Sequence, residues 1–332
     1  MVSTKAPLDL TLDSIREYTH AENPSAFLSV SSGNSYFTEP GLPGVIVYRE
    51  TGVFLVQFGG PFTAADSSAA LLEAFRAFAT GQNRRVVAIQ LQRSDAELYA
   101  KQGFTVNQVG ASYAIELDQF TLSGTRFMQL RNKIVRAHKA GLVVVEVDLA
   151  DWSDTMRDLD AVWLQGKGEH AKQLEFLVGE YGGDMQAHRR LFVGTIDGEL
   201  AGYISYSPVY GARAGWMHDL SRRIPGKLPG IMEAINKTAI DIFMAEGVAW
   251  LHFGFTPFTG LDLAQEVPSY SPGFNHLMQL LWEYGEAVYP AKTQLAYKQK
   301  WTQHLVLPEY VAFDGGADIA GFVHVFRASG AL

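Results

Sequence analysis

Along the first third of the chain, hydrophobic runs typical of β-strands alternate with hydrophobic residues at the spacing of an α-helix. Two runs rich in β-branched and aromatic residues, 45–48 and 53–58, are separated at Gly52 and predict a pair of strands. Apolar positions then recur at helical spacing over 64–80, which predicts a helix that ends at Gly81. A strand, a short helix and a further strand are predicted after it, in this order: 85–91, 95–102 and 113–117.

The second part of the chain repeats this order. Two apolar runs flank Asp197-Gly198, a dipeptide typical of two-residue hairpin turns, and predict a second hairpin of 191–196 with 200–207. A helix, a strand, a helix and a late strand are predicted after it, in this order: 230–246, 248–253, 275–286 and 295–301. Each half thus predicts hairpin, helix, strand, helix and strand, which indicates an internal duplication.

This order of elements is that of the GNAT acyltransferase architecture, an α/β fold whose mixed sheet splays open to admit the substrate. We therefore predict a tandem, duplicated GNAT-like fold. Its expected parts are an N-terminal half, a connecting helix and a catalytic half: 1–122, 123–141 and 142–332. A length of 332 residues agrees with two domains of ordinary size.

Composition narrows the classes of protein and of chemistry. Hydrophobic residues make up 47% and charged residues 19%, a mixture typical of folded chains. The absence of cysteine excludes disulfides, zinc–thiolate sites and a cysteine nucleophile, and it favours an intracellular protein. Residues 1–13 lack the features of a secretion signal, and no apolar run reaches the roughly 18 residues of a membrane-spanning helix. We expect a cytoplasmic protein, soluble or peripheral at the inner face of the membrane.

The connecting segment is basic within an acidic protein. The net charge of -8 argues against indiscriminate binding to nucleic acid, so any such contact must be local. Five basic residues occur in this segment with no acidic residue among them: Arg126, Arg131, Lys133, Arg136 and Lys139. They form either the ordinary solvated face of a helix or a site for a polyanion, such as a tRNA acceptor stem or a lipid head group.

Four motifs in a fixed order carry a resemblance to a known family. The first is the basic helix at 124–141, and the second is Asp219-Leu-Ser-Arg222 with Gly230-Ile-Met-Glu233, which is similar to D-L-M-R and G-x-M-D. The third, at 252–260, is like F-N-L-G-M-A-P-L-S-G, and the fourth, at 295–301, is like R-x-F-K-x-K-F. Together they resemble the catalytic domain of the lysyl-phosphatidylglycerol synthases, the multiple peptide resistance factor family. The chain departs from the pattern at His252, where the family has asparagine, and at Trp301, where it has phenylalanine. No stretch of these 332 residues resembles the family's transmembrane flippase portion.

The resemblance implies an aminoacyltransferase that takes the amino acid from an aminoacyl-tRNA ester. The implied acceptor is a hydroxyl of phosphatidylglycerol or a related acceptor. Soluble relatives and the Fem-type peptidyl transferases, which have a similar double fold, also serve cell-wall or small-molecule acceptors, with an amine or a hydroxyl as the attacking group. An activated ester needs no covalent nucleophile. The enzyme must align the acceptor, remove its proton and stabilise the oxyanion. We expect no cofactor besides the aminoacyl-tRNA co-substrate.

Two lysines near the C-terminus are the first candidates for this chemistry. Lys298 and Lys300 are two residues apart on a predicted strand, so both are expected on the same side, where an ammonium contacts a developing alkoxide or a phosphate. Alone, such a pair is more often a solvated strand face. The family motif around it favours Lys298 as the functional residue.

A second candidate group follows the predicted strand 215–217. We hypothesise that Asp219 binds the aminoacyl amino group or takes the acceptor proton, and that Arg222 holds a phosphate or the carbonyl oxygen. An exposed ion pair is the alternative. Glu233 is either a second carboxylate of the site or a surface position on a helix.

One histidine stands within an apolar strand. His252 is more often, in such a setting, a core histidine with its hydrogen bonds made than a substrate ligand, and both interpretations stay open. No histidine pair has the spacing of metal ligands on one helix face, so no metal is predicted.

Two rival functions remain. An acetyl-CoA-dependent GNAT enzyme binds pyrophosphate at a glycine-containing turn, but the nearest candidate, 223–228, fails at its last position and Gly59-Gly60 lacks the pattern. A non-catalytic binding module on the same fold is the second rival. It is expected to keep its ligand when Lys298 and Asp219 are substituted, with no transfer to lose.

Overall fold

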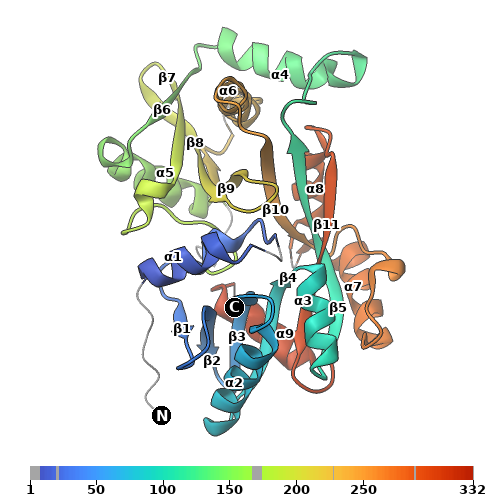
Figure 1. Cartoon of the computed structure of the whole chain (residues 1–332). Helices are drawn as coiled ribbons and strands as arrows, with labels where there is room; N and C mark the ends of the chain where they lie inside the picture. Colours follow the sequence, from blue (N-terminus) through green and yellow to red (C-terminus); the bar gives the residue numbers. More distant parts are fainter. Residues whose placement is uncertain (1–7, 20–21, 167–173, 227, 288, 332) are drawn as a thin grey trace.

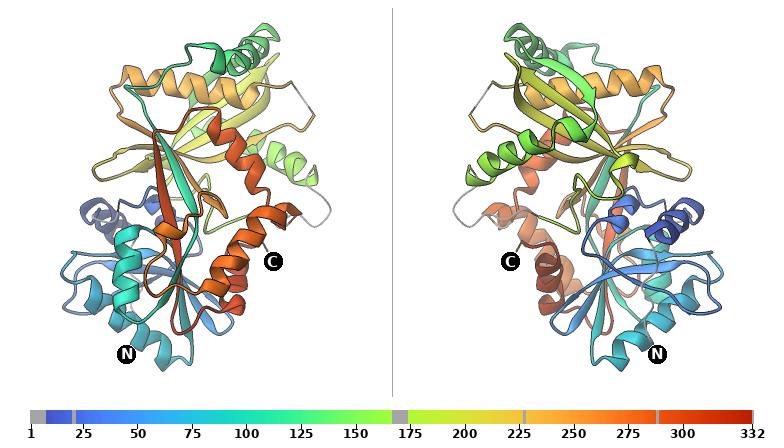
Figure 2. Two further views of the ribbon diagram at one scale, coloured as in Figure 1. Left: turned by 90° about the vertical axis from the view of Figure 1, so that its right-hand side faces the viewer. Right: turned by 90° about the vertical axis from the view of Figure 1, so that its left-hand side faces the viewer.

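The computed structural model describes residues 8–19, 22–166, 174–226, 228–287 and 289–331. Within these residues, eleven strands form one mixed sheet in the order β1-β2-β3-β4-β11-β5-β10-β9-β8-β7-β6. Helices cover both of its faces (Figures 1 and 2). β1 to β4 lie in the lower part of Figure 1 and β6 to β9 in the upper part.

The sheet is built from these strands: β1 (Ser35–Phe37), β2 (Val45–Thr51), β3 (Phe54–Phe62), β4 (Arg85–Leu91), β5 (Thr105–Glu116), β6 (Val143–Val147), β7 (Arg190–Ile196), β8 (Glu199–Val209), β9 (Gly215–Arg223), β10 (Trp250–Pro257) and β11 (Leu305–Phe313). The α-helices are α1 (Leu8–Glu17), α2 (Ser68–Gly81), α3 (Arg93–Lys101), α4 (Met128–Lys139), α5 (Ser153–Gln165), α6 (Ile231–Ala245), α7 (Pro272–Tyr284), α8 (Ala291–Gln299) and α9 (Ile319–Ala328). A short 3₁₀ helix, η1 (Ala26–Val30), follows α1.

Most elements predicted from periodicity are present. Both hairpins form, the second across Asp197, whose positive φ of 53° suits the turn. Helix α6 shows why the pattern was informative: Ile231, Ile235 and Phe243 are all buried along its inner face. Burying each such side chain stabilises the fold by about 2 kcal/mol.

The predicted strand 295–301 is wrong. Most of these residues belong to α8, and the late strand is β11. The segment is rich in strong helix formers, and Tyr297 and Trp301, four residues apart, place their rings 6.3 Å from each other on one side. Local alternation of polar and apolar residues was outweighed by this helical pairing.

The two halves are interlocked through exchanged strands. β11, late in the chain, lies between β4 and β5, while β5 pairs on its other side with β10. Helix α9 packs on β2, β3 and β4. The halves therefore share one sheet, and the domain bounds 1–122, 123–141 and 142–332 stay a prediction about sequence. Among the described helices, none is both long and apolar enough to cross a bilayer.

Candidate functional site

The sheet opens between β9 and β10. These two strands pair in parallel only over Gly215–Met217 and Trp250–His252, and they diverge beyond. Each strand carries an irregularity just past the last pair. The register between β8 and β9 shifts so that Asp219 has no cross-strand partner, and that between β10 and β5 shifts around Gly254, whose φ is +64°. Such bulges reorient side chains and are frequent beside active sites.

Lys298 reaches into this opening from α8. Its Nζ donates to the carbonyl oxygens of Gly254 at 2.7 Å and Phe255 at 3.1 Å, and it lies 5.7 Å from the centre of the Tyr113 ring. The side chain is buried. Burial lowers the pKa of Lys298 to about 7, although the nearby carboxylate of Glu309 acts in the opposite direction.

A buried carboxylate lies near this lysine. Glu309 is on β11 and accepts a hydrogen bond from the Ser112 hydroxyl. Burial raises the pKa of Glu309 to about 7, and contacts with Ser112 and Gln92 partly offset this rise. Both groups are buried in a low dielectric, so their charges interact strongly. Ionised Glu309 raises the pKa of Lys298, and protonated Glu309 removes this effect.

His218 completes the polar groups on this face of the sheet. Its Nδ1 is 3.3 Å from Oδ1 of Asn236, and its ring packs edge-on against Tyr297. Burial lowers the pKa of His218 to about 4, and the positive charge of Lys298 adds to the effect. A neutral imidazole therefore stands beside the lysine at neutral pH.

Asp219 lies on β9, the other strand of the opening. It is two residues past the last parallel pair on β9, as Gly254 is on β10. The residue is half-buried, and its Oδ2 is enclosed without a hydrogen-bond partner among the described residues. Burial raises the pKa of Asp219 to about 6, while Arg189, Ser207 and the Gly179 amide act to lower it.

Arg189 was missed in the sequence. Its side chain is 0% exposed, its guanidinium lies 5.1 Å from the centre of the Phe27 ring, and Nη2 is 3.6 Å from Oε1 of Glu180. A signal was available, because Arg189-Arg190 directly precedes the predicted strand 191–196 and consecutive residues of an extended segment face opposite ways. Arg190 indeed turns to the carboxylates of Glu146 and Glu246 instead.

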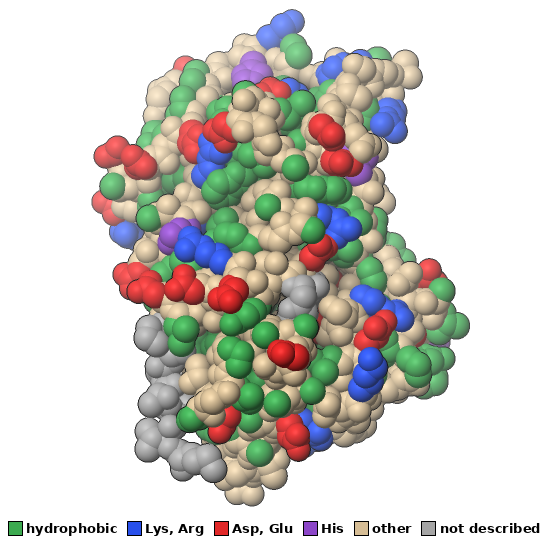
Figure 3. Space-filling model, viewed as in Figure 1, with side chains coloured by type: hydrophobic (Ala, Val, Ile, Leu, Met, Phe, Trp, Pro, Cys, Tyr) green, Lys and Arg blue, Asp and Glu red, His purple; other side chains and the backbone are tan. Residues whose placement is uncertain are grey.

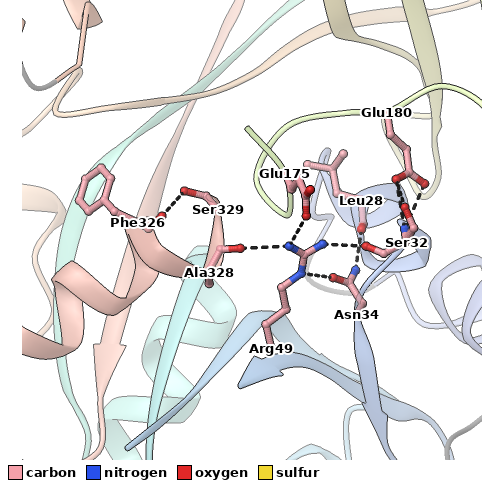
Figure 4. Close-up of polar contacts among 9 residues, drawn as sticks. All are labelled: Leu28, Ser32, Asn34, Arg49, Glu175, Glu180, Phe326, Ala328 and Ser329. Atoms are coloured by element: carbon pink, nitrogen blue, oxygen red, sulfur yellow. Dashed lines mark hydrogen bonds and ion pairs between the residues drawn. The ribbon is translucent and has the colours of Figure 1, made fainter. Parts of the chain in front are cut away.

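The segment 174–180, here called the strap, covers Asp219. Gly179 packs so closely that an added Cβ would lie 2.2 Å from the Asp219 carboxyl carbon, so no larger residue fits without displacement. Figure 4 shows how the strap is tied to the first half: Arg49 Nη1 donates to Glu175 at 3.0 Å, and the Ser32 amide donates to Glu180 at 3.1 Å. The guanidinium of Arg49 also donates to carbonyl oxygens of Ser32 and Ala328.

The structure separates the two lysines predicted to share one side. While Lys298 is buried at the opening, Lys300 follows the end of α8 and donates to Oε1 of Glu233 at 3.0 Å. Lys133 of α4 lies 4.0 Å from the same oxygen. Glu233 is buried, so the surface interpretation is wrong. These three charges join α8, α6 and α4 to one another.

Arg222 lies away from Asp219. Its guanidinium stacks on the Trp163 ring at 3.9 Å and its Nη1 donates to the carbonyl of Ser221 at 2.9 Å. It faces α5, on the side of β9 that carries Tyr203, its cross-strand neighbour. Asp219 interacts electrostatically with Arg189, whereas Arg222 stacks on Trp163 of α5, so the structure does not bring this predicted pair together.

His252 is a core histidine with its hydrogen bond made. It is 2% exposed, and its Nε2 lies 2.9 Å from the carbonyl oxygen of Arg213. Burial lowers the pKa of His252 to about 4. The contacts match the core interpretation rather than that of a substrate ligand. Among the described residues no group of three potential metal ligands is found.

The basic connecting helix is α4, preceded by a 3₁₀ turn. Arg126, Arg136 and Lys139 are exposed, whereas Arg131 donates to the carbonyl oxygens of Leu122 and Gly124. Figure 3 shows blue side chains along the upper edge of the molecule, over the position of α4 in Figure 1. Part of the basic set is therefore available to a ligand, and part of it holds the connection in place.

Comparison with known proteins places the chain in a family. The family described as phosphatidylglycerol lysyltransferase, C-terminal, matches residues 14–313. The chain belongs to this family. It is 24% identical over 270 residues to the phosphatidylglycerol lysyltransferase of Bacillus subtilis, covering 75% of this chain and 30% of that protein. It is 22% identical over 311 residues to the lysylphosphatidylglycerol biosynthesis bifunctional protein LysX of Rhodococcus jostii, covering 90% and 27%.

Solved structures confirm the fold class of this family member. The C-terminal domain of a putative lysylphosphatidylglycerol synthetase from Agrobacterium fabrum has a TM-score of 0.77 at 20% identity, covering 98% of both chains. L-PGS from Bacillus licheniformis has a TM-score of 0.79 at 18% identity, covering 99% and 97%. The chain spans about 30% of the length of the curated relatives named above, so their whole activity is not carried over by likeness alone.

Proposed function

We propose that this chain transfers an aminoacyl group from an aminoacyl-tRNA to a hydroxyl or amine acceptor, and that a phosphatidylglycerol-type lipid is the favoured acceptor. The family and the named lysyltransferase relatives support a transferase acting on such a lipid. A small-molecule acceptor is the other possibility that the chemistry allows, because the same activated ester is attacked in each case.

The observation that carries the proposal is the clamp on Lys298. Two carbonyl oxygens, those of Gly254 and Phe255, hold two of its N–H groups. The third position on Nζ is then an N–H in the ammonium and a lone pair in the amine. With a pKa of about 7, both forms are populated at neutral pH, which suits a group that accepts and returns a proton.

The proposed reaction uses this lysine twice. The acceptor hydroxyl attacks the ester carbonyl carbon, its proton passes to the Lys298 lone pair, and the carbonyl electron pair moves onto oxygen. Collapse of this intermediate re-forms the carbonyl and expels the ribose oxygen, which takes the proton back from Nζ. His218, neutral at this pH, leaves the amine without a competing charge on that side.

The exposed basic residues of α4 and of the 3₁₀ turn before it support an RNA donor. Arg126, Arg136 and Lys139 present positive charge on an otherwise acidic protein, and phosphate contacts of this kind supply sequence-independent affinity. The start of α6, where CoA enzymes hold pyrophosphate, is occupied. Gly230 packs against the backbone carbonyl of Lys133, and the first-turn carboxylate of Glu233 already engages Lys300.

The test is transfer of label. The full chain is incubated with a panel of radiolabelled aminoacyl-tRNAs, with and without phosphatidylglycerol vesicles, and with labelled acetyl-CoA in a parallel arm. We expect label to leave one tRNA species for lipid or for an added acceptor. Label that stays on every tRNA, together with acetyl transfer from CoA, contradicts the proposal.

A further inference from the structure

The two edges of the sheet differ in how they are protected. β1, at one edge, is three residues long, and two of its residues, Tyr36 and Phe37, are buried. β6, at the other edge, is five residues long and has the sequence Val-Val-Val-Glu-Val (Figure 1). Among the described residues, only β7 pairs with it. The outer side of β6 therefore offers backbone amides and carbonyls to another strand.

β6 lacks the features by which exposed edge strands usually avoid pairing. It contains neither proline nor lysine, and its described register with β7 runs without a bulge. Val143 and Val145 are 58% and 42% exposed, and valine is among the residues that most favour strands. The charge of Glu146 is already balanced, because Nε of Arg190 donates to its Oε1 at 2.6 Å. The edge is thus apolar and regular, as expected of a strand that pairs with another.

The charges on either side of β6 have opposite signs. Arg136 and Lys139 precede it at the end of α4, and Asp148 and Asp151 follow it. All four are exposed, and none of them forms an ion pair within the described part of the chain. When two β6 strands pair antiparallel, the basic end of each copy lies beside the acidic end of the other, so both ends attract. Parallel pairing brings like charges together instead.

We propose that β6 is a dimerisation edge, at which a second copy of this chain adds its own β6 antiparallel to the first. The two sheets then continue into one another across a two-fold axis near Val145, the middle residue of the strand. Such an isologous contact closes on itself. The protected edge at β1 gives no second site for growth, so assembly stops at two copies. The flanking charges complement each other, which favours a copy over an unrelated peptide, and this contact does not depend on aminoacyl transfer.

The oligomeric state of the full chain tests the edge. Sedimentation velocity over roughly 1 to 100 µM should show a monomer–dimer equilibrium, because a contact made by so few residues is small and weak. Val145→Lys places two like charges at the two-fold axis and should weaken association at least tenfold. Val53→Lys is the matched control. Val53 is also exposed, at 58%, but it lies in the turn between β2 and β3, so association should stay within about twofold of wild type.

Charge reversal tests the antiparallel orientation. Lys139→Glu turns an attraction at each end of the contact into a repulsion, so it should weaken association roughly fivefold at low salt. Asp148→Lys should have a similar effect. The double variant with both substitutions restores opposite charges at both ends, and its association should return to within about twofold of wild type. A double variant that associates no more tightly than either single variant overturns the antiparallel pairing.

The absence of cysteine allows a direct test of proximity. A short bis-maleimide should join two copies of the Val145→Cys variant, whereas it should leave Val53→Cys monomeric on a denaturing gel. This small substitution also serves if Val145→Lys does not fold, which circular dichroism of each variant will show.

The remaining outcomes are equally decisive. Wild type that stays monomeric over the whole concentration range overturns the proposal, and β6 is then an edge left for a different chain. A dimer that folded Val145→Lys leaves unchanged, or that Val145→Cys does not cross-link, uses another surface and overturns it as well. Growth beyond two copies means that the contact does not close, which contradicts the two-fold arrangement.

Discussion

The sheet opens twice, once in each half, and the two openings use the same backbone device. In the first half, β3 and β4 pair over Phe54–Phe58 and Arg85–Ile89, and the next residue on β4, Gln90, has a φ of +55°. Its carbonyl oxygen accepts from Asn23 Nδ2 at 3.1 Å. In the second half, Gly254 has a φ of +64° and its carbonyl accepts from Lys298 Nζ.

The difference between the openings is chemical. Asn23 brings an amide that neither gains nor loses a proton, and it also packs against Gly59, where an added Cβ would lie 3.1 Å from Nδ2. Lys298 brings an amine whose pKa of about 7 allows proton transfer. The same backbone device therefore holds an amide in one opening and an ionisable amine in the other, so the splay of the strands alone does not make a site.

The largest expected effect on transfer comes from substitution of Lys298, compared with substitution of Asn23, the donor in the first opening. Lys298→Met keeps the length of the side chain and removes the amine, so transfer should fall about 1,000-fold, within the usual range for a general acid–base group. Asn23→Leu should leave kcat within twofold and lower the free energy of unfolding by about 1–3 kcal/mol, because the Gln90 carbonyl loses its donor. Initial rates and urea denaturation of both variants measure this.

Lys292→Met is the control variant for the loss of a lysine from α8. It is exposed on the same helix, and Lys292→Met should transfer at the wild-type rate. A Lys298→Met variant that folds and retains full activity would place the proton transfer elsewhere.

The pH dependence should also distinguish the openings. If neutral Lys298 is the base, kcat/KM should rise about tenfold per pH unit below pH 7 and level off above it, since only the deprotonated amine accepts a proton. Stability has a related signature. Because the folded pKa lies below the ordinary 10.5, the unfolded chain binds the extra proton between pH 7 and 10.5, and this contribution to stability grows with pH.

Subtraction of the Lys298→Met curve isolates both effects. The rate of wild type at pH 6, 7 and 8 and the urea midpoints of both proteins between pH 7 and 10 are sufficient. A pH-independent rate, with folding intact throughout, is incompatible with this role of the lysine.

The first opening contains an ionisable group as well, but its expected effect is on stability. Asp95 is buried beside Gly60 at the end of β3 and accepts from the Gln92 amide at 3.0 Å. Burial raises the pKa of Asp95 to about 7. The folded state therefore binds this proton more tightly, and the stabilisation present below pH 3.8 is lost as pH rises to about 7.

Asp95→Asn should remove the loss of folding stability that wild type shows as pH rises to about 7. The variant should gain at most about 4 kcal/mol over wild type above pH 7, with transfer unchanged. Chemical denaturation at pH 4, 6 and 8 measures it. If the variant instead shifts the pH profile of transfer, the first opening takes part in proton movement and the contrast between the openings is broken.

Hydrophobic periodicity predicts individual helices and strands, but it does not predict features that depend on contacts between segments far apart in the chain. The pattern over 230–246 gives α6 because one buried stripe determines it, whereas no local pattern places β11 between β4 and β5. The family motif favours Lys298, whereas the strand face predicted for Lys298 and Lys300 is wrong because this segment forms α8. Asp219 and Arg189 meet only because a bulge, a strap and a loop converge, and bulges leave little trace in hydrophobic spacing.

The smallest expected effect comes from the backbone device itself. Gly254→Ala puts a side chain on a left-handed residue whose Cβ would lie 3.2 Å from the Met217 sulfur. Such strain costs about 1–2 kcal/mol of stability. The strained backbone should also turn the Gly254 carbonyl away from Lys298, which lowers transfer by about tenfold.

Gly141, also left-handed at φ +89° but with open space at its Cβ, is the matched control. Gly141→Ala should lose similar stability while transfer stays at the wild-type rate; an equal loss of transfer in both variants would mean that global strain, rather than the carbonyl that holds Lys298, sets the rate.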